Sequence, residues 1–462
     1  MTKKIIMYNV MIIMYFVVLG LLMYYGKNSI TRREIMNILW LINIPLPEAS
    51  KLLNEKPIPF GGWLVNASLS LSQRDSINLS VAFPKKDTTE IKVLKGEKIN
   101  YYEFSSINNK MVISSYSTQF EKILNMVKPD IVHIYGTEYP HSIAMVNTCN
   151  KMNIKTVISI QGLVSIYSKH YMAYLPNKVQ KTFTVRDFIK QDNLERQQKK
   201  FTQRGKLEIE AIEKVQHVIG RTTWDKACTT QINSKVKYHF CNETLRDEFY
   251  KNKWYLDKCE RYSIFVSQAS YPIKGLHFML EAMPLILKKF PNTKLYISGA
   301  DITKSNTLKD KLKKTSYAKY IVELIKRYNL KDKVIFTGLL DEKQMCKRYQ
   351  KSNVFVCSSS IENSPNSLGE AMILGVPCVA SDVGGVSDML EHKEEGFVYQ
   401  TDAPYMLAYY ICEIFGNNDL ALKLSKSARE HAFKTHNREE NTEKLIDIYH
   451  SILNGNLSED TK

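Results

Sequence analysis

The sequence predicts two α/β domains, each an open and largely parallel sheet with helices on both faces. The chain has 462 residues, which is too many for one hydrophobic core and suits two domains of ordinary size. Short apolar runs alternate with helical stretches, a pattern typical of parallel sheets. A charged stretch at residues 254–261 interrupts the alternation, which then starts again. We therefore expect one doubly wound domain on each side of this linker.

The composition is that of a globular protein with an excess of positive charge. Apolar residues make up 44% of the chain, charged residues 24%, and the formal net charge is +17 at pH 7. Nucleic acid, an anionic membrane surface or phosphate-bearing substrates would each suit this charge. Because the sequence has no zinc-type spacing, RNA-binding aromatic motif or basic region with heptads, we expect no nucleic-acid partner. The eight cysteines form no Cys-x-x-Cys pair, which favours reduced, buried thiols over disulfides or metal ligands.

Residues 5–25 are almost entirely apolar, with Asn9 as the one strongly polar interruption. As a helix they would span roughly 30 Å, the thickness of a hydrocarbon core. No small-residue cleavage site precedes Gly26, so we expect residues 1–35 to hold an uncleaved membrane anchor. Basic residues flank both ends, so the positive-inside rule does not orient it. The alternative is an extension upstream of the working enzyme, since Met36 could itself be a start.

Predicted strands and helices alternate through the first half of the chain. The predicted strands are residues 37–44, 77–83, 131–135, 156–160 and 218–221, the last of which we expect to close the first sheet. The predicted helices are a stretch that follows Gly62 and runs through Ser72, and residues 119–127 and 142–152.

Two glycines, Gly61 and Gly62, stand between the first predicted strand and the first helix. Glycine at this place lets a substrate approach the backbone closely. A plain turn is an equal alternative for a lone Gly-Gly pair.

Polar side chains follow the carboxyl ends of the later strands, where ligands of such sheets bind. Glu138, His141 and Gln161 are candidate acceptor-side contacts, and His141 is also a candidate catalytic residue. Each could instead cap a helix or satisfy a loop. Arg221 ends the predicted strand at 218–221 and is either a phosphate contact or a structural ion pair.

The stretch 178–206 carries nine basic residues with aromatic and aliphatic side chains interleaved. A solvated helical face is the simplest interpretation. Contact with anionic lipid head groups is the functional alternative, given the possible anchor.

The second half repeats the alternation. Predicted strands are residues 263–267, 294–298, 334–338, 353–357, 376–381 and 396–399, and predicted helices are residues 276–289, 420–433 and 441–453. Lys274 stands just ahead of the helix at 276–289, where an ammonium group can meet a diphosphate.

The most informative stretch is residues 358–377, a polar loop between a buried strand and a helix that starts near Asn366 or Ser367. Helix N-termini bind anions through their free N–H groups and dipole. Two carboxylates bracket the turn, Glu362 in the loop and Glu370 in the first helical turn. A carboxylate repels phosphate, so we expect Glu370 to accept hydrogen bonds from a neutral polyol such as a ribose.

These residues resemble a known family. Lys274-Gly275, Gly338 after an apolar strand, and Glu362-x7-Glu370 before Gly375-Val-Pro377 are similar to the retaining nucleotide-sugar glycosyltransferases of family four. The resemblance covers residues 36–453. It implies the GT-B fold, with two Rossmann-like domains facing across a cleft and the last helix crossing back to the first domain. Together with the predicted anchor and linker, it divides the chain into four segments, which are residues 1–35 (hydrophobic helix, expected membrane anchor), 36–255 (acceptor domain), 256–430 (donor domain) and 431–462 (crossing helix).

The same resemblance implies roles for the donor-side residues. Glu370 would bind the ribose hydroxyls, Glu362 would lie beside the donor sugar, and Lys274 would pair with the phosphates. The remaining donor contacts would be the helix-start residues Asn366, Ser367 and Leu368 at the diphosphate, and Gly338 with Leu339 at the base.

Two positions depart from the family pattern. The arginine usually found six residues before the lysine is Gln268 here, so Lys274 and the helix N-terminus would carry more of the diphosphate charge, with help from Arg221. Gln161 stands where many relatives have a histidine facing the donor sugar. Both departures make the donor less certain.

We expect the donor bond to break through an oxocarbenium-like state with charge moving onto the diphosphate. Because Glu370 has another role, we assign no protein nucleophile and favour front-face transfer with retention. The sequence shows no Asp-x-Asp metal clamp, and we expect neither metal nor cofactor. The acceptor would be a glycan or lipid-linked glycan of a cell-surface polysaccharide, at the cytoplasmic face of the cell membrane in a single-pass or peripheral enzyme.

Two other activities fit the same motifs. A nucleotide-sugar epimerase of the same fold would hydrolyse its donor without an acceptor. A membrane scaffold that binds a nucleotide-sugar without catalysis would form no product, and the complete set of Lys274, Glu362 and Glu370 argues against it.

Overall fold

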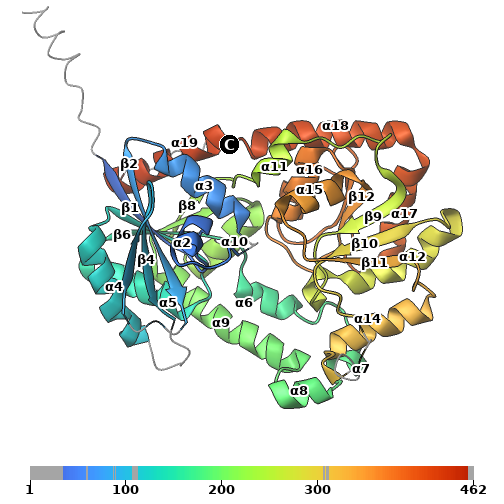
Figure 1. Ribbon diagram of the computed structural model, residues 1–462, viewed down its shortest axis with the longest axis horizontal. Helices are drawn as coiled ribbons and strands as arrows, with labels where there is room; N and C mark the ends of the chain where they lie inside the picture. Colours follow the sequence, from blue (N-terminus) through green and yellow to red (C-terminus); the bar gives the residue numbers. More distant parts are fainter. Residues whose placement is uncertain are drawn as a thin grey trace, which may run out of the picture.

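The computed structural model describes residues 35–58, 61–86, 88, 90–106, 113–304, 307 and 312–455. The chain forms two open α/β sheets that lie side by side, the first in blue to green and the second in yellow to orange (Figure 1). The predicted pair of doubly wound, largely parallel domains is confirmed.

The first sheet has eight strands in the order β3-β4-β2-β1-β5-β6-β7-β8. All neighbours pair in parallel except β3 with β4, which are antiparallel. The central strands are almost wholly buried, as expected where helices cover both faces. The strands are β1 (Met36–Leu41), β2 (Ile77–Lys85), β3 (Lys92–Lys95), β4 (Asn100–Ser105), β5 (Ile131–Tyr135), β6 (Lys155–Ser159), β7 (His217–Gly220) and β8 (Lys237–Phe240).

Helices connect these strands and cover the sheet. A long connection between β6 and β7 leaves the sheet, runs below the second domain and returns along α9 (Figure 1). The helices are α2 (Pro47–Leu52), α3 (Gly62–Ser72), α4 (Ile113–Val127), α5 (Pro140–Met152), α6 (Val164–Tyr167), α7 (Asn177–Gln180), α8 (Val185–Lys190), α9 (Leu194–Lys214), α10 (Thr223–Ile232) and α11 (Asp247–Lys251), with a short 3-10 turn at Ser168–His170.

The second sheet has six strands in the order β11-β10-β9-β12-β13-β14, all paired in parallel. The strands are β9 (Glu260–Val266), β10 (Lys294–Ser298), β11 (Val334–Gly338), β12 (Ser352–Cys357), β13 (Cys378–Ser381) and β14 (Phe397–Tyr399). The helices are α12 (Leu276–Lys289), α14 (Ser316–Arg327), α15 (Glu342–Gln350), α16 (Asn366–Leu374), α17 (Pro404–Gly416), α18 (Asn418–Thr435) and α19 (Arg438–Asn454), with 3-10 turns at Pro272–Lys274 and Val386–Asp388.

Strand order reverses once in each sheet, between β1 and β5 in the first and between β9 and β12 in the second. Ligands of doubly wound sheets bind beyond the carboxyl ends of the strands at such a reversal. This topology places the loop after β12, which contains Glu362, at the binding edge of the second sheet.

The last helix returns to the first sheet. In Figure 1, α18 runs along the second domain and α19 lies over the first. Tyr449 on α19 is fully buried; its hydroxyl accepts a hydrogen bond from Trp40 Nε1 at 3.0 Å and lies 2.7 Å from His133 Nδ1. Apolar residues of α19 complete the core on this face of the sheet.

Several details differ from the sequence-based prediction. The prediction that the strand at residues 218–221 closes the first sheet is wrong, because β8 pairs with β7 and lies outside it. Strands β3 and β4 and helix α17 were not predicted. The stretch predicted as a linker begins with Trp254, which is buried and donates a hydrogen bond to Ser352 O at 2.7 Å.

The predicted anchor in residues 1–35 lies outside the described residues, which begin at Ile35. Within the part of the chain that the structure describes, no helix combines the length and the hydropathy needed to cross a bilayer.

Candidate active site

A cleft of about 330 Å³ lies between the two domains. The first domain contributes Gly61, Gly62, Trp63, Leu245 and Arg246. The second domain contributes the ends of β9 and β12 and the start of α16, among them Gln268, Lys274, Ser359, Glu362, Asn366, Ser367 and Glu370. The cleft therefore brings together most of the residues predicted for the donor side and the two glycines predicted for the acceptor side.

The turn from β12 into α16 forms one wall of the cleft. Pro365 precedes the helix with an extended backbone, and Gly375 ends it with a φ of +83°. Every residue from Ser358 to Ser364 is buried, although most of them are polar. Their hydrogen bonds include bonds within the turn, to Lys274 O and to Ser381 at the end of β13, so the turn is a firmly held part of the interior.

Lys274 and Glu362 form an ion pair inside the cleft. Lys274 Nζ lies 2.5 Å from Glu362 Oε1, and Ser359 Oγ donates to the same oxygen at 2.7 Å. Burial by itself would lower the pKa of Lys274, but the charge of Glu362 outweighs burial and raises this pKa above its ordinary value. Lys274 is therefore a permanent cation at the point where a phosphate group could bind.

Two glycines hold this pair in place through close backbone contacts. Gly275 has a φ of +67°, and a Cβ atom there would lie 1.8 Å from Ser358 O. Gly384 has a φ of +56°, and a Cβ atom there would lie 1.8 Å from Glu362 O. Any larger residue at either position would push the chain that carries Lys274 or Glu362 out of place.

Arg246 and Glu370 form a second ion pair, with two parallel hydrogen bonds. Arg246 Nε donates to Oε1 at 2.6 Å and Nη2 donates to Oε2 at 2.7 Å. Burial raises the pKa of Glu370, and Arg246 limits that rise; in turn, Glu370 raises the pKa of Arg246 although burial opposes it. A carboxylate has further lone pairs, so Glu370 can still accept hydrogen bonds from a ligand while Arg246 holds it.

The other predicted donor residues differ in their positions. Gln268, Asn366, Ser367 and Leu339 line the cleft. Leu368 is in the first turn of α16, and its side chain is buried in the core. Its backbone N–H donates to Pro365 O at 2.9 Å. Gly338 lies at the end of β11, where its carbonyl accepts from Gly299 N at 2.9 Å. The predicted donor roles of all these residues stay predictions.

Gln161 and Arg221 meet at the carboxyl edge of the first sheet, beside the cleft. Both contact Glu243, which accepts from Gln161 Nε2 at 2.6 Å and pairs with Arg221 Nη1 at 2.7 Å. Glu243 also accepts from Asn366 Nδ2 at the start of α16, at 3.1 Å. Arg221 was predicted to be either a phosphate contact or part of a structural ion pair, and the structure contains the ion pair. Gln161 and Arg221 therefore reach the donor helix indirectly, through Glu243.

Glu138 and His141 do not line the cleft. Glu138 pairs with Arg204 at 2.5 Å. His141 is buried with Nε2 2.7 Å from Asn43 Oδ1, and burial lowers its pKa to about 3. Its imidazole is therefore neutral and held by Asn43 in this arrangement. Catalytic and acceptor-binding roles for these two residues stay predictions.

Arg246 and Glu243 are site residues that the sequence reasoning missed. Both lie in the short polar run between β8 and α11, which contains no recognised motif. The only signal in the sequence is the presence of charged residues directly after a strand end, where ligands of such sheets bind.

No group of three or more His, Cys, Asp or Glu side chains suited to holding a metal ion occurs among the described residues. The cations that face the cleft are Lys274 and Arg246.

The fold and the cleft define a class of protein. Two Rossmann-like domains that meet at the carboxyl edges of their sheets, with a C-terminal helix returning to the first domain, have the arrangement of GT-B glycosyltransferases. Residues 246–431, which contain both ion pairs, match the family model of glycosyl transferases group 1. The match is to this part of the chain, and the resemblance to glycosyltransferases predicted from the sequence is confirmed.

Solved structures share the fold. Sucrose-phosphate synthase from Thermosynechococcus elongatus is similar with a TM-score of 0.67 and 16% identity, over 91% of this chain and 100% of the other. Anabaena HepE in complex with UDP and glucose has a TM-score of 0.61 and 13% identity, over 90% and 100% of the two chains. At these identities the similarity shows the fold alone.

Among relatives by sequence, the putative glycosyltransferase YtcC of Bacillus subtilis (strain 168) is 24% identical over 70% of this chain and 73% of its own length. The poly(ribitol-phosphate) alpha-N-acetylglucosaminyltransferase of Staphylococcus aureus (strain COL) is 27% identical over 39% of this chain and 34% of its own length.

Proposed function

We propose that the protein transfers a sugar from a nucleotide-sugar donor to a glycan or lipid-linked acceptor, with retention of the anomeric configuration. The observation that carries this proposal is the placement of Lys274–Glu362 and Arg246–Glu370 around one helix N-terminus in one interdomain cleft. This arrangement offers a cation for phosphate and a held carboxylate for hydroxyl groups.

The donor in this proposal is a UDP-sugar. The structural relative HepE is described in complex with UDP and with UDP-glucose, and that similarity supports the choice. Glu370 would accept from the ribose hydroxyls, and Glu362 would contact the sugar. The N-terminus of α16 and Lys274 would balance the diphosphate charge in place of a metal ion, so we expect turnover to survive a chelator.

In the proposed reaction, the bond between the anomeric carbon and the β-phosphate oxygen breaks, and its electron pair stays on the phosphate. Lys274 stabilises that charge as it develops. The acceptor hydroxyl attacks from the same face and gives its proton to the departing phosphate oxygen. The proposal uses no protein nucleophile, and it gives Glu362 the role of a sugar contact whose Oε1 is held by Lys274 and Ser359. Retention follows from attack on the face that the leaving group vacates.

The acceptor in this proposal belongs to a cell-surface polysaccharide, assembled at the cytoplasmic face of the membrane. The Staphylococcus aureus relative named above is a poly(ribitol-phosphate) alpha-N-acetylglucosaminyltransferase, and its polymer substrate supports a polymeric acceptor here. The excess of positive charge suits an anionic membrane surface. A hydrophobic anchor in residues 1–35, an acceptor domain at 36–255, a donor domain at 256–430 and a crossing segment at 431–462 complete the proposal.

The direct test is a screen of UDP-, GDP- and ADP-sugars for an increase in melting temperature. The best donor is then incubated with lipid-linked glycans, and the anomeric configuration of the product is read by NMR. We expect a UDP-sugar to stabilise the protein and the product to keep the donor's configuration. An inverted product contradicts retention, and stabilisation without any product favours the non-catalytic scaffold.

A further inference from the structure

The connection between β6 and β7 forms a protruding element at the lower edge of the molecule (Figure 1). Its inner side is anchored in the second domain, where Leu175, Val179 and Leu194 join the hydrophobic core. Ala173 O lies 2.8 Å from His277 Nε2 of α12. The element is therefore a fixed part of the fold, although it extends far from its own sheet.

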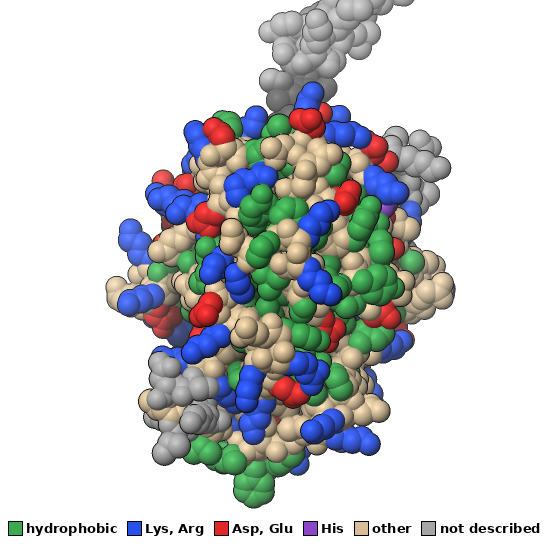
Figure 2. Space-filling model, turned by 90° about the vertical axis from the view of Figure 1, so that its right-hand side faces the viewer, with side chains coloured by type: hydrophobic (Ala, Val, Ile, Leu, Met, Phe, Trp, Pro, Cys, Tyr) green, Lys and Arg blue, Asp and Glu red, His purple; other side chains and the backbone are tan. Residues whose placement is uncertain are grey.

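The outer side of this element is apolar. Phe188 and Ile189 on α8 are 68% and 70% exposed, and Phe183 and Val185 beside them are 49% and 52% exposed. We call these four side chains the α8 patch. Figure 2 shows hydrophobic side chains at the lower end of the molecule, the level at which α8 lies in Figure 1. Full burial of one such large apolar side chain would be favourable by roughly 1.5–3 kcal/mol of free energy.

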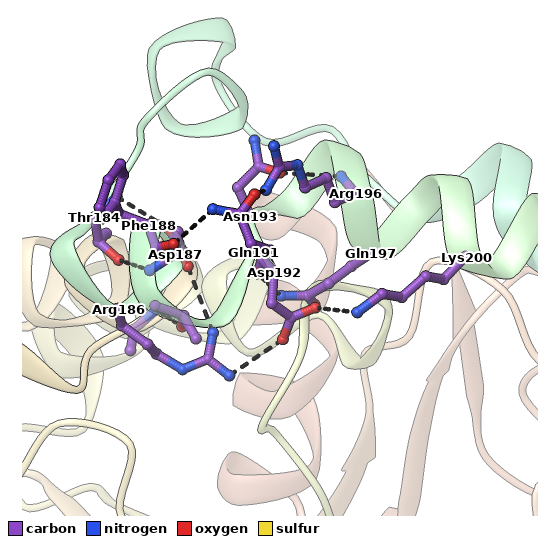
Figure 3. Close-up of polar contacts among 12 residues, drawn as sticks. Thr184, Arg186, Asp187, Phe188, Gln191, Asp192, Asn193, Arg196, Gln197 and Lys200 are labelled. Carbon is purple, nitrogen blue, oxygen red and sulfur yellow. Dashed lines mark hydrogen bonds and ion pairs between the residues drawn. The ribbon is translucent and has the colours of Figure 1, made fainter. Parts of the chain in front are cut away.

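A polar network holds α8 rigidly in this orientation (Figure 3). Thr184 and Asp187 form a reciprocal capping box at the start of the helix. Arg186 donates to Asp187 at 3.4 Å and to Asp192 at 3.2 Å, and Lys200 of α9 reaches Asp192 at 3.0 Å. A six-residue helix is not stable alone, so this network fixes the direction in which the α8 patch points.

Positive charge surrounds the α8 patch. Residues 174–200 contain seven basic and three acidic side chains. Asp187 and Asp192 are already paired with Arg186 and Lys200. Lys178, Lys181, Lys190 and Lys199 are exposed and form no ion pair with any other described side chain. Free lysines beside apolar side chains are the composition of a surface that lies in a lipid interface.

We propose that the α8 patch is a membrane-interface element. Its apolar side chains would enter the boundary between head groups and acyl chains, and the four free lysines would contact the phosphates of anionic lipids. This inference rests on the proposed function and deepens it, because a lipid-linked acceptor is presented at that surface.

A bilayer fits the α8 patch better than a second copy of this chain. A two-fold interface would bring the same lysines of both copies together, and like charges repel. Four side chains also provide far less than the roughly 800 Å² per partner of a standard protein interface.

The surface is independent of the segment before β1. The described chain begins next to β1, which is in the upper left part of Figure 1, whereas α8 is at the lower edge. A test therefore needs a readout specific to α8, because the anchor proposed in residues 1–35 would also bind lipid.

Tryptophan fluorescence quenching by brominated phosphatidylcholine supplies that readout. Phe188→Trp is compared with Tyr409→Trp, which lies on α17 and is 54% exposed in the wild-type protein. Both full-length variants are mixed with vesicles of phosphatidylcholine, with and without phosphatidylglycerol, and the wild-type signal of the four native tryptophans is subtracted. We expect quenching of Trp at position 188 in the anionic vesicles and none at position 409.

A charge variant gives the second measurement. Replacing Lys178, Lys181 and Lys190 by Gln in the Phe188→Trp protein should weaken α8 insertion about fivefold per lysine, since each basic residue near an anionic surface contributes about that factor. Quenching at position 188 no stronger than at position 409 overturns the proposal. A concentration-dependent dimer in sedimentation velocity that is lost in Phe188→Ser also overturns the proposal, because a second copy of the chain then covers the α8 patch.

Activity separates this inference from the proposed function. Phe188→Ser with Ile189→Ser should keep wild-type turnover on a water-soluble acceptor and lose turnover on a vesicle-borne one. Insertion of α8 without any sugar transfer would support the membrane-interface proposal and contradict the proposed glycosyltransferase activity. Sugar transfer without insertion of α8 would support the glycosyltransferase activity and contradict the membrane-interface proposal.

Discussion

Arg246 and Glu370 lie 124 residues apart in the chain and form a two-hydrogen-bond ion pair at the base of the cleft. Arg246 comes from the segment after the first sheet, whereas Glu370 is in the first turns of α16 in the second domain. The carboxylate proposed to bind the ribose is therefore oriented by a residue from outside its own helix.

The first prediction concerns Arg246. Arg246→Ala should weaken nucleotide binding about tenfold at pH 7, because it leaves Glu370 buried, unpaired and inclined to take a proton. Burial raises the pKa of Glu370, and losing Arg246 raises it further, so affinity in the variant should recover as the pH increases through that pKa. Calorimetric titration with UDP between pH 6 and pH 9 checks this, with Arg327→Ala on α14 as an exposed control. Affinity that does not change with pH in the variant contradicts the role.

The second prediction separates the two acids. Glu370→Ala should weaken binding of UDP itself about 10- to 100-fold, the range for losing hydrogen bonds to a charged group. Glu362→Gln should leave UDP affinity unchanged and raise the KM for the UDP-sugar. Equal effects of both substitutions on UDP would refute the division between a ribose contact and a sugar contact.

The third prediction concerns Lys274. Lys274→Ala should lower kcat about 10²-fold or more, because Lys274 stabilises the departing diphosphate and Arg246, the other cation at the cleft, is held by Glu370. Steady-state kinetics with Lys326→Ala, an exposed change on α14, as the control measures the effect. Wild-type turnover in Lys274→Ala would exclude the role.

The fourth prediction is a loss of stability in mild acid. Burial lowers the pKa of His133 to about 3 and those of His277 and His436 to about 4. In the unfolded chain these groups titrate near pH 6.5, so below that pH the unfolded state binds protons that the folded state does not. Each should cost about 2 kcal/mol at pH 5 relative to pH 7.

Urea unfolding at pH 7.5, 6 and 5 measures that loss. His133→Gln should flatten the pH dependence, and His450→Gln, which changes an exposed side chain on α19, should not. A stability that stays constant from pH 7 to pH 5 means that the buried histidines are accessible to protons in the folded protein.

Much of the second domain could be predicted from the sequence. The segments 276–289, 294–298 and 334–338 were predicted with the bounds that α12, β10 and β11 have, because their apolar runs are clearly flanked by turn residues. Strand β3 was missed since three of its four residues are exposed and it has no continuous apolar run. The arrangement of Glu362 and Glu370 on either side of one turn could be predicted because both acids are close together in the sequence.

Partners across the cleft could not be predicted. Arg246 and Glu243 contact residues that are distant in the chain, and no spacing rule connects them to Glu370, Gln161 or Asn366. The sequence located the turn, and only the packing of two domains shows which charges meet there.

The return of α19 to the first sheet has a consequence for synthesis of the protein. The ribosome makes β1 before the second domain, but it makes the helix that covers the core face of β1 only after that domain. Until then, the apolar surface around Trp40 stays open to water. The second domain can fold as it is translated, whereas the core of the first domain can be completed only after the second domain has been made.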